Sequence, residues 1–146
     1  MSLNVHKLIG FFIVTLFLAS CKKEGCTDKN TSNYSADADK DDGTCQFKGN
    51  LVFWYNEETS IWLDNQGSSS LTFYVDGALV GSTSATVYWT GAPSCGSNAS
   101  ITVTKDMGFS KSKSYSYSIV DDFGDTIWAG TITIDANTCT TFQLTS

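Results

Sequence analysis

Apolar and polar residues alternate through most of the chain after Phe47, and this pattern constrains the fold more than any other feature. Apolar side chains recur at every second position within 71–75 and 115–119, and Trp128, Gly130, Ile132 and Ile134 share one face of a strand; residues 51–55 are apolar throughout. A period of two places these side chains on one face of a β-strand, whereas a helix repeats every 3.6 residues. No segment after residue 20 has a convincing helical period. The pattern therefore predicts an all-β domain over residues 47–146.

Turn signals divide this domain into short strands. Asp76-Gly77 is typical of a two-residue hairpin turn, and residues 121–125 form a second turn-rich segment. Val87 and Trp89 alternate with polar neighbours and predict a further strand. Short strands spaced about 8–15 residues apart are typical of two packed sheets. We expect an antiparallel β-sandwich of about seven strands.

Residues 1–20 have the organisation of a secretory signal. Lys7 supplies a positive charge, and residues 8–19 form a mostly apolar stretch. That stretch is shorter than the ~20 residues needed to cross a bilayer, but it suits the hydrophobic region of a signal peptide. We predict that residues 1–20 are a signal peptide that is absent from the mature protein.

The signal ends in Leu18-Ala19-Ser20-Cys21, which resembles the bacterial lipobox. The resemblance implies diacylglycerol on the Cys21 sulfur, cleavage before Cys21 and an acylated N-terminus. The alternative is an ordinary signal with an incidental Cys, and the polar Lys22-Lys23-Glu24 that follows argues against it. Two or more acyl chains hold a protein on a membrane. Lys22, rather than Asp, after the Cys implies the outer membrane; the periplasmic and exterior faces remain alternatives.

Four further cysteines indicate disulfides. Cys26 and Cys45 lie in an acidic segment, and Cys95 and Cys139 lie in the β-domain. Four cysteines in an exported protein allow three pairings. We favour Cys26–Cys45 and Cys95–Cys139, because each pair falls within one compositional segment. A metal site made of all four thiolates is disfavoured by the lack of any C-x-x-C pair.

Residues 26–46 contain too few apolar residues for a core of their own. This segment resembles the short G-C-T-D-x-x-A-x-N-Y-x-x-x-A-x-x-D-D-G-[ST]-C module of secreted and surface proteins of Bacteroidota. The matching residues are Cys26, Thr27, Asp28, Asn33, Tyr34, Ala38, Asp41, Asp42, Gly43, Thr44 and Cys45. The resemblance implies a mini-domain or spacer. The expected organisation is signal peptide 1–20, anchor and tether 21–25, acidic module 26–46 and β-sandwich 47–146.

The acidic module also suggests a tentative calcium site. Its candidate ligands are Asp28, Asp37, Asp39, Asp41 and Asp42, and Ca²⁺ takes 6–8 oxygen ligands. The spacing does not match that of an EF-hand loop, and no flanking amphipathic helices are expected. The alternative is a solvated acidic turn that ends in Asp-Gly. No other cofactor is expected.

The absence of Arg, and of His outside the predicted signal, excludes several kinds of catalytic and binding site. All nine basic residues are Lys, and the single His is His6 in the predicted signal. The mature chain therefore lacks a His-based catalytic triad, His ligands for zinc and an Arg clamp for phosphate. The formal net charge of −6 disfavours nucleic acid as a partner. A hydrolase that uses Lys, Ser or carboxylates remains open, but we predict a non-enzymatic protein.

Several motifs of the β-domain resemble a functionally undefined domain of small Bacteroidota lipoproteins. They are Leu51-Val52-Phe53-Trp54, Val75-Asp76-Gly77, Ala92-Pro93-Ser94-Cys95-Gly96, Tyr115-Ser116-Tyr117 and Trp128-Ala129-Gly130-Thr131-Ile132-Thr133-Ile134. The last two also resemble transthyretin-like and carboxypeptidase-regulatory-like sandwiches. These resemblances imply an adaptor or binding domain, and a fold alone carries no activity.

Trp54 and Trp62 are tentative ligand-binding residues. Flat aromatic rings stack on sugars, and Trp62 lies near Glu57, Glu58 and Asp64 in the sequence. The alternative is that the tryptophans fill the core, since each ring buries a large area. Glu57-Glu58 is interpreted as a solvated loop.

These observations favour a lipoprotein anchored through Cys21, whose non-enzymatic sandwich binds a protein or a glycan or has a structural role. The alternatives are a carbohydrate-binding module and a calcium-dependent surface adhesin.

Overall fold

The computed structural model of the chain describes residues 22–146. The predicted signal peptide and the lipidation of Cys21 lie outside the described residues. Within residues 22–146, no helix is both long enough and apolar enough to span a bilayer. The elements follow in the order β1 (Glu24–Gly25), β2 (Lys40–Asp41), β3 (Phe47–Trp54), α1 (Glu57–Asn65), β4 (Ser70–Val75), β5 (Ala78–Ser84), β6 (Ile101–Gly108), β7 (Ser112–Asp121), β8 (Thr126–Asp135) and β9 (Cys139–Gln143).

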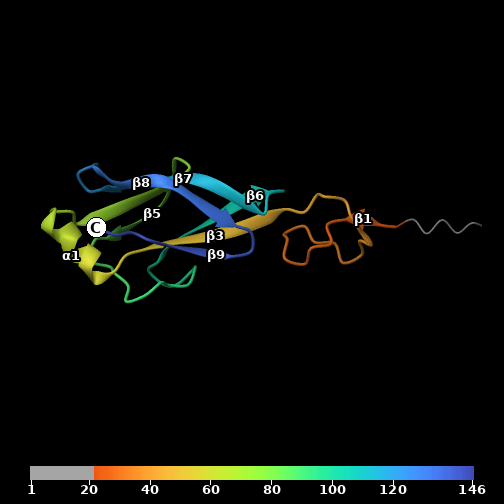
Figure 1. Cartoon of the computed structure of the whole chain (residues 1–146), viewed down its shortest axis with the longest axis horizontal. Helices are drawn as coiled ribbons and strands as arrows, with labels where there is room; N and C mark the ends of the chain where they lie inside the picture. The colour runs from red at the N-terminus through yellow and green to blue at the C-terminus, as the bar shows by residue number, and fades with distance from the viewer. Residues whose placement is uncertain (1–21) are drawn as a thin grey trace, which may run out of the picture.

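Strands β3–β9 form two sheets that pack face to face (Figure 1). One has the order β6-β3-β9 and the other the order β5-β4-β7-β8. Aromatic rings fill the space between them: Phe53 of β3 lies 5.5 Å from Phe73 of β4 and 5.6 Å from Tyr117 of β7, measured between ring centroids. Phe142 of β9 completes the cluster, 5.2 Å from Tyr117. The predicted all-β sandwich of about seven strands is confirmed.

Strand β9 departs from the expected antiparallel arrangement, because it pairs with β3 in parallel, from Asn50↔Cys139 to Trp54↔Gln143. The turn after β8 explains this direction. Asn137 has a left-handed φ of 59°, and its amide donates to the Lys48 carbonyl at 2.8 Å. The turn thus carries the chain from the four-stranded sheet to the start of β3, and β9 then runs alongside β3.

Residues 85–100 form a long loop from β5 to β6, and therefore from one sheet to the other. The strand expected around Val87 and Trp89 is absent. The Val87 amide donates to Ser84 in a turn at 3.0 Å, and the Trp89 amide donates to Tyr55 just beyond β3 at 2.9 Å. The loop lies on the side of β3 away from the core (Figure 1), where Val52 is nevertheless fully buried.

The two predicted disulfides are confirmed. Cys95–Cys139 joins the 85–100 loop to the first residue of β9. Because β9 is at an edge of its sheet, this bond fastens both the loop and the edge strand. Cys26–Cys45 closes the N-terminal residues 22–46, called the acidic segment below.

Helix α1 is a correction to the sequence analysis, which predicted no helix and placed Glu57-Glu58 in a loop. The helix begins at an N-cap, where the Asn56 side chain accepts from the Thr59 amide at 3.0 Å. Glu57 and Glu58 lie in the first turn, where their negative charges interact favourably with the positive end of the helix dipole. The helix has no clear apolar stripe, because two of its three buried residues, Thr59 and Ser60, are polar. A hydrophobic pattern therefore cannot reveal it.

The helix covers one end of the sandwich, and the acidic segment lies at the opposite end (Figure 1). Leu63 of α1 is fully buried in the core. The Ser60 hydroxyl donates to the Ala85 carbonyl at 2.7 Å, and Thr59 donates to the Leu144 carbonyl at 3.4 Å. These bonds tie the helix to the start of the 85–100 loop and to the end of the chain.

Candidate functional site

Three of the predicted calcium ligands cap their own turns. Asp28 accepts from the amide two residues later at 3.0 Å, and Asp41 does the same at 3.0 Å. Asp42 accepts from the Thr44 amide at 2.9 Å and from its hydroxyl at 2.6 Å, and these bonds hold the Asp42 pKa below its usual value. These carboxylates thus stabilise turns of the segment, which agrees with its interpretation as a solvated acidic turn.

The other two predicted ligands are also not part of an assembled cage. Asp37 forms an ion pair with Lys23 at 2.8 Å, which lowers the Asp37 pKa, and Asp39 is exposed. Across residues 22–146, no three His, Cys, Asp or Glu side chains are arranged to hold a metal ion. The geometry therefore provides no preformed calcium site at Asp28, Asp37, Asp39, Asp41 and Asp42.

Trp54 and Trp62 border different parts of the surface. Both are half-buried. Trp54 lines a space of only about 10 Å³ beneath the 85–100 loop, which is too small for a sugar ring. Trp62 packs on Trp128, with 5.8 Å between ring centroids, and borders a depression of about 300 Å³ beside the exposed Phe123. The structure does not bring the two predicted ligand-binding tryptophans together.

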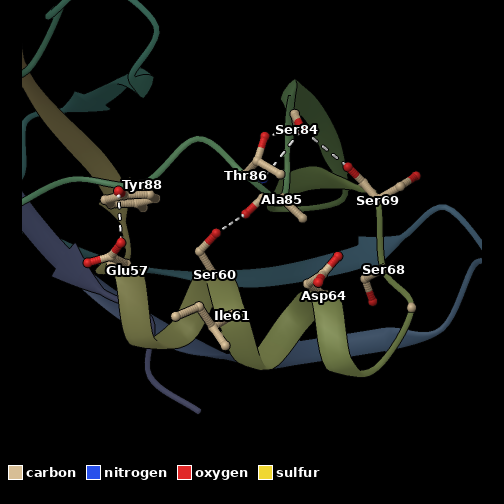
Figure 2. Close-up of a pocket in the computed structure, with 11 residues that line it drawn as sticks. Glu57, Ser60, Ile61, Asp64, Ser68, Ser69, Ser84, Ala85, Thr86 and Tyr88 are labelled. Carbon is tan, nitrogen blue, oxygen red and sulfur yellow. Dashed lines mark hydrogen bonds between the residues drawn. The ribbon is translucent and has the colours of Figure 1, made fainter.

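A larger pocket, of about 440 Å³, lies between α1 and the start of the 85–100 loop (Figure 2). Helix α1 supplies one wall, and the end of β5 and the loop supply the other. We call this the helix-end pocket. Its lining consists of two carboxylates, several hydroxyls, Ile61 and Tyr88: Glu57, Ser60, Ile61, Asp64, Gly67, Ser68, Ser69, Ser84, Ala85, Thr86 and Tyr88.

The hydroxyls of this pocket donate inward, into the protein. Ser60 donates to the Ala85 carbonyl at 2.7 Å, and Ser68 donates to the buried Asp121 carboxylate at 3.1 Å. Ser69 donates to the Asp122 carboxylate at 2.8 Å, and the bonds that Ser69 makes through its amide and hydroxyl lower the Asp122 pKa. A hydroxyl has one hydrogen and two lone pairs. Each of these serines therefore has lone pairs, but no free hydrogen, for a ligand.

The hydroxyls of Ser84 and Thr86, on the loop wall, can form a chain of hydrogen bonds that also donates into the protein. Ser84 lies 3.4 Å from the Ser69 carbonyl and 2.9 Å from the Thr86 hydroxyl. When Thr86 donates to Ser84 and Ser84 donates to Ser69, both hydrogens are used (Figure 2). The loop wall then also presents hydrogen-bond acceptors.

Glu57 and Asp64 lie at opposite ends of the helix wall (Figure 2). Seven residues make about two helical turns, which places the two positions on one face about 10 Å apart along the axis. The Tyr88 hydroxyl donates to Glu57 at 3.1 Å; this hydrogen bond, with the nearby carboxylate charge, raises the Tyr88 pKa. Ile61 lies between the two carboxylates in the sequence and is 57% exposed.

Sequence reasoning named Glu57, Glu58 and Asp64 as neighbours of Trp62 and placed Glu57-Glu58 in a solvated loop. It missed the pocket because it missed the helix. The Asn56 cap followed by Glu57-Glu58 was the available local signal. Nothing in the sequence could indicate that Tyr88, in a segment expected to be a strand, faces Glu57.

Comparisons with known proteins leave the function to be argued from this geometry: no family model, no curated protein and no solved structure matches the chain.

Proposed function

We propose that the chain is an outer-membrane lipoprotein, anchored through lipid on Cys21, whose sandwich is a non-enzymatic binding domain. The acidic segment is its spacer, and the helix-end pocket is its binding site. The lipobox resemblance and the polar residues after Cys21 support the anchor.

The position of the pocket is the observation that carries the proposal. The described chain begins at the acidic segment, and the helix-end pocket lies at the other end of the long axis (Figure 1). A chain tethered at Cys21 would present the pocket away from the lipid surface. Between the two, the Cys26–Cys45 disulfide holds the acidic segment in a compact form.

A binding role suits the chemistry of the pocket better than catalysis does. A nucleophilic serine needs a base to take its proton. Ser60 donates to a backbone carbonyl instead, and Ser68 and Ser69 are held by structural carboxylates. No lysine of residues 22–146 lines this pocket, so none can serve as the base there.

The anchor is tested by replacing the lipidated residue. Cys21→Ala should abolish acylation and release the protein from the membrane fraction, because the lipid is the only proposed attachment. Mass spectrometry of the wild-type N-terminal peptide measures the lipid directly. The anchor would be contradicted if the Cys21→Ala protein still fractionated with the membrane and Cys21 of the wild-type protein carried no lipid.

The binding role is tested by blocking the pocket. Thr86 and Thr90 are exposed residues of the same loop, and only Thr86 lines the pocket. The full-length protein in non-ionic detergent is screened against a glycan array and panels of cationic, anionic and neutral small molecules. We expect a ligand class whose binding is lost in Thr86→Trp and retained in Thr90→Trp. Equal binding by both variants across all panels would show that the pocket is not the site.

A further inference from the structure

The helix-end pocket offers a ligand many acceptors and few donors. All six hydroxyls that line it can give their hydrogens to partners within the protein, as described above. Backbone amides on its walls are also used: Ser69 donates to Asp122 at 2.9 Å, and Thr86 donates to Ser84 at 3.3 Å. Two carboxylates add formal negative charge, and no lysine compensates them.

This polarity selects between ligand classes. An ammonium group has three donors and no acceptor, so it leaves nothing unsatisfied in a site made of acceptors. A sugar hydroxyl also carries lone pairs, for which this pocket has few donors. Phosphate and carboxylate ligands are acceptors with negative charge, and Glu57 and Asp64 would repel them.

The spacing of the two carboxylates adds a length requirement. About 10 Å separates their positions along the helix axis. Among residues 22–146, neither carboxylate belongs to a group of three His, Cys, Asp or Glu side chains that could hold a metal ion. Two ammonium groups joined by an aliphatic stem can reach both carboxylates. The exposed side of Ile61 and the ring of Tyr88, 41% exposed, supply apolar surface for the stem.

We infer that the helix-end pocket binds a linear aliphatic amine with an ammonium group at each end, one beside Glu57 and the other beside Asp64. The inference rests on the proposed function in taking this pocket as the binding site. The same chemistry is offered by a free polyamine and by a pair of lysine side chains on a protein.

The first test uses probes of matched shape. Wild-type full-length protein in non-ionic detergent is titrated calorimetrically with diaminooctane, diaminobutane and octanediol. Diaminooctane should bind most tightly, because its extended length is close to the ~10 Å that separates the two positions along the helix axis. Diaminobutane should bind more weakly, and octanediol, which has the same stem without charge, should give no heat. Equal binding of octanediol would overturn the inference.

The second test uses charge-removing variants. Glu57→Gln and Asp64→Asn should each weaken diaminooctane binding by about threefold, the effect expected for an exposed ion pair. Glu58→Gln is the matched control, because it removes the same charge from the same helix turn and Glu58 does not line the pocket. Raising the salt concentration should weaken wild-type binding through screening. An equal loss in Glu58→Gln would show diffuse attraction instead of a site.

A third test distinguishes a free polyamine from lysine side chains of a protein. It compares diaminooctane with a peptide that has two lysines and with the Nε-acetylated form of that peptide. Binding of the peptide that disappears on acetylation, with weaker binding of diaminooctane, assigns the site to lysine side chains; the reverse order assigns it to a free polyamine. If neither amine binds, the inference is wrong. A ligand of another class that Thr86→Trp blocks would in that case leave the proposed binding role intact.

Discussion

The acidic segment, at one end of the molecule, and the sandwich, which makes up the rest of the described chain, are stabilised by different interactions (Figure 1). Within residues 22–46, the buried side chains are those of Cys26 and Cys45. The rest of the segment depends on short-range bonds, such as those from Asn33 to the Thr44 carbonyl at 2.6 Å and from the Gln46 amide to Asn33 at 2.7 Å. The sandwich instead packs a continuous core between two sheets, and this buried cluster extends to the Cys26–Cys45 disulfide.

This difference shows what each kind of segment needs from its sequence. A core requires many apolar residues with a regular period, because burial of apolar area drives its assembly. A disulfide-closed segment requires particular polar residues at particular positions, because individual side chains make the hydrogen bonds that hold its turns. The acidic segment and the sandwich should therefore respond to different perturbations.

The largest expected effect is on the core. Phe53→Ala removes the ring that contacts Phe73, Tyr117 and Phe142. It should lower the free energy of unfolding of the sandwich by about 3–5 kcal/mol through lost burial and a cavity. Chemical denaturation measures this loss. Amide exchange in residues 22–46 should be unchanged. Faster exchange there would show that the stability of the acidic segment depends on that of the sandwich.

Removing the Cys95–Cys139 disulfide should have the next largest effect. The double variant Cys95→Ser, Cys139→Ser frees both the loop and the edge strand β9, and should cost the sandwich about 2–4 kcal/mol. Reduction of the wild-type protein with Cys26–Cys45 kept intact serves as a chemical control. Unchanged thermal unfolding would show that the hydrogen bonds of β9 to β3 suffice.

Alkaline pH should weaken the sandwich through Tyr55. Burial raises the pKa of Tyr55 from 10.0 to about 12. A raised folded pKa means that the stabilisation is complete below pH 10 and is lost as the pH rises through 12. The loss is about 2–3 kcal/mol. Comparing denaturation of wild type and Tyr55→Phe from pH 9 to 12 isolates this group, because Phe cannot ionise. An identical pH dependence in both proteins would assign the effect to other groups.

Opening the acidic segment should barely affect the sandwich. In Cys26→Ser, Cys45→Ser, amide protection within residues 22–46 should be lost, since few apolar contacts remain to hold the segment. The free energy of unfolding of the sandwich should change much less than in the Cys95→Ser, Cys139→Ser variant, because the sandwich keeps its own disulfide and its two sheets. A large decrease in the melting temperature of the sandwich would contradict the separation between the two ends.

Acid should act on the acidic segment through Asp42, and this is the smallest effect. Hydrogen bonds from Thr44 lower the Asp42 pKa below 3.8. The stabilisation is therefore present above that value and is lost as the pH falls through the lowered pKa. Thr44→Val removes the hydroxyl bond and should raise the Asp42 pKa, as measured by NMR titration of the carboxyl carbon. An unchanged pKa would show that the amide bond alone sets it.

Much of the sandwich could be predicted because its strands carry a regular pattern. In β4, Leu71, Phe73 and Val75 are buried and alternate with half-buried neighbours, as the sequence indicates. The disulfide pairs followed from the division of the chain into segments. The parallel pairing of β9 could not be predicted, because it depends on where the turn at Asn137 delivers the chain, and a period of two is the same in either direction.

The candidate site was much less predictable. Helix α1 buries Thr59 and Ser60 through hydrogen bonds to Leu144 and Ala85, which are distant in the sequence. Such bonds replace the apolar stripe by which helices are usually recognised. The helix-end pocket then depends on the meeting of α1 with the 85–100 loop, a contact between segments that no local pattern encodes.

The parallel pairing of β3 with β9 has a consequence for the order in which the sheets can form during synthesis. The first strand of the sandwich finds its partner in the last strand of the chain, so the three-stranded sheet cannot be completed until the C-terminal residues are available. Folding that must wait for such a distant partner is slow. In a nascent chain, β3 therefore lacks its parallel neighbour until β9 has been synthesised.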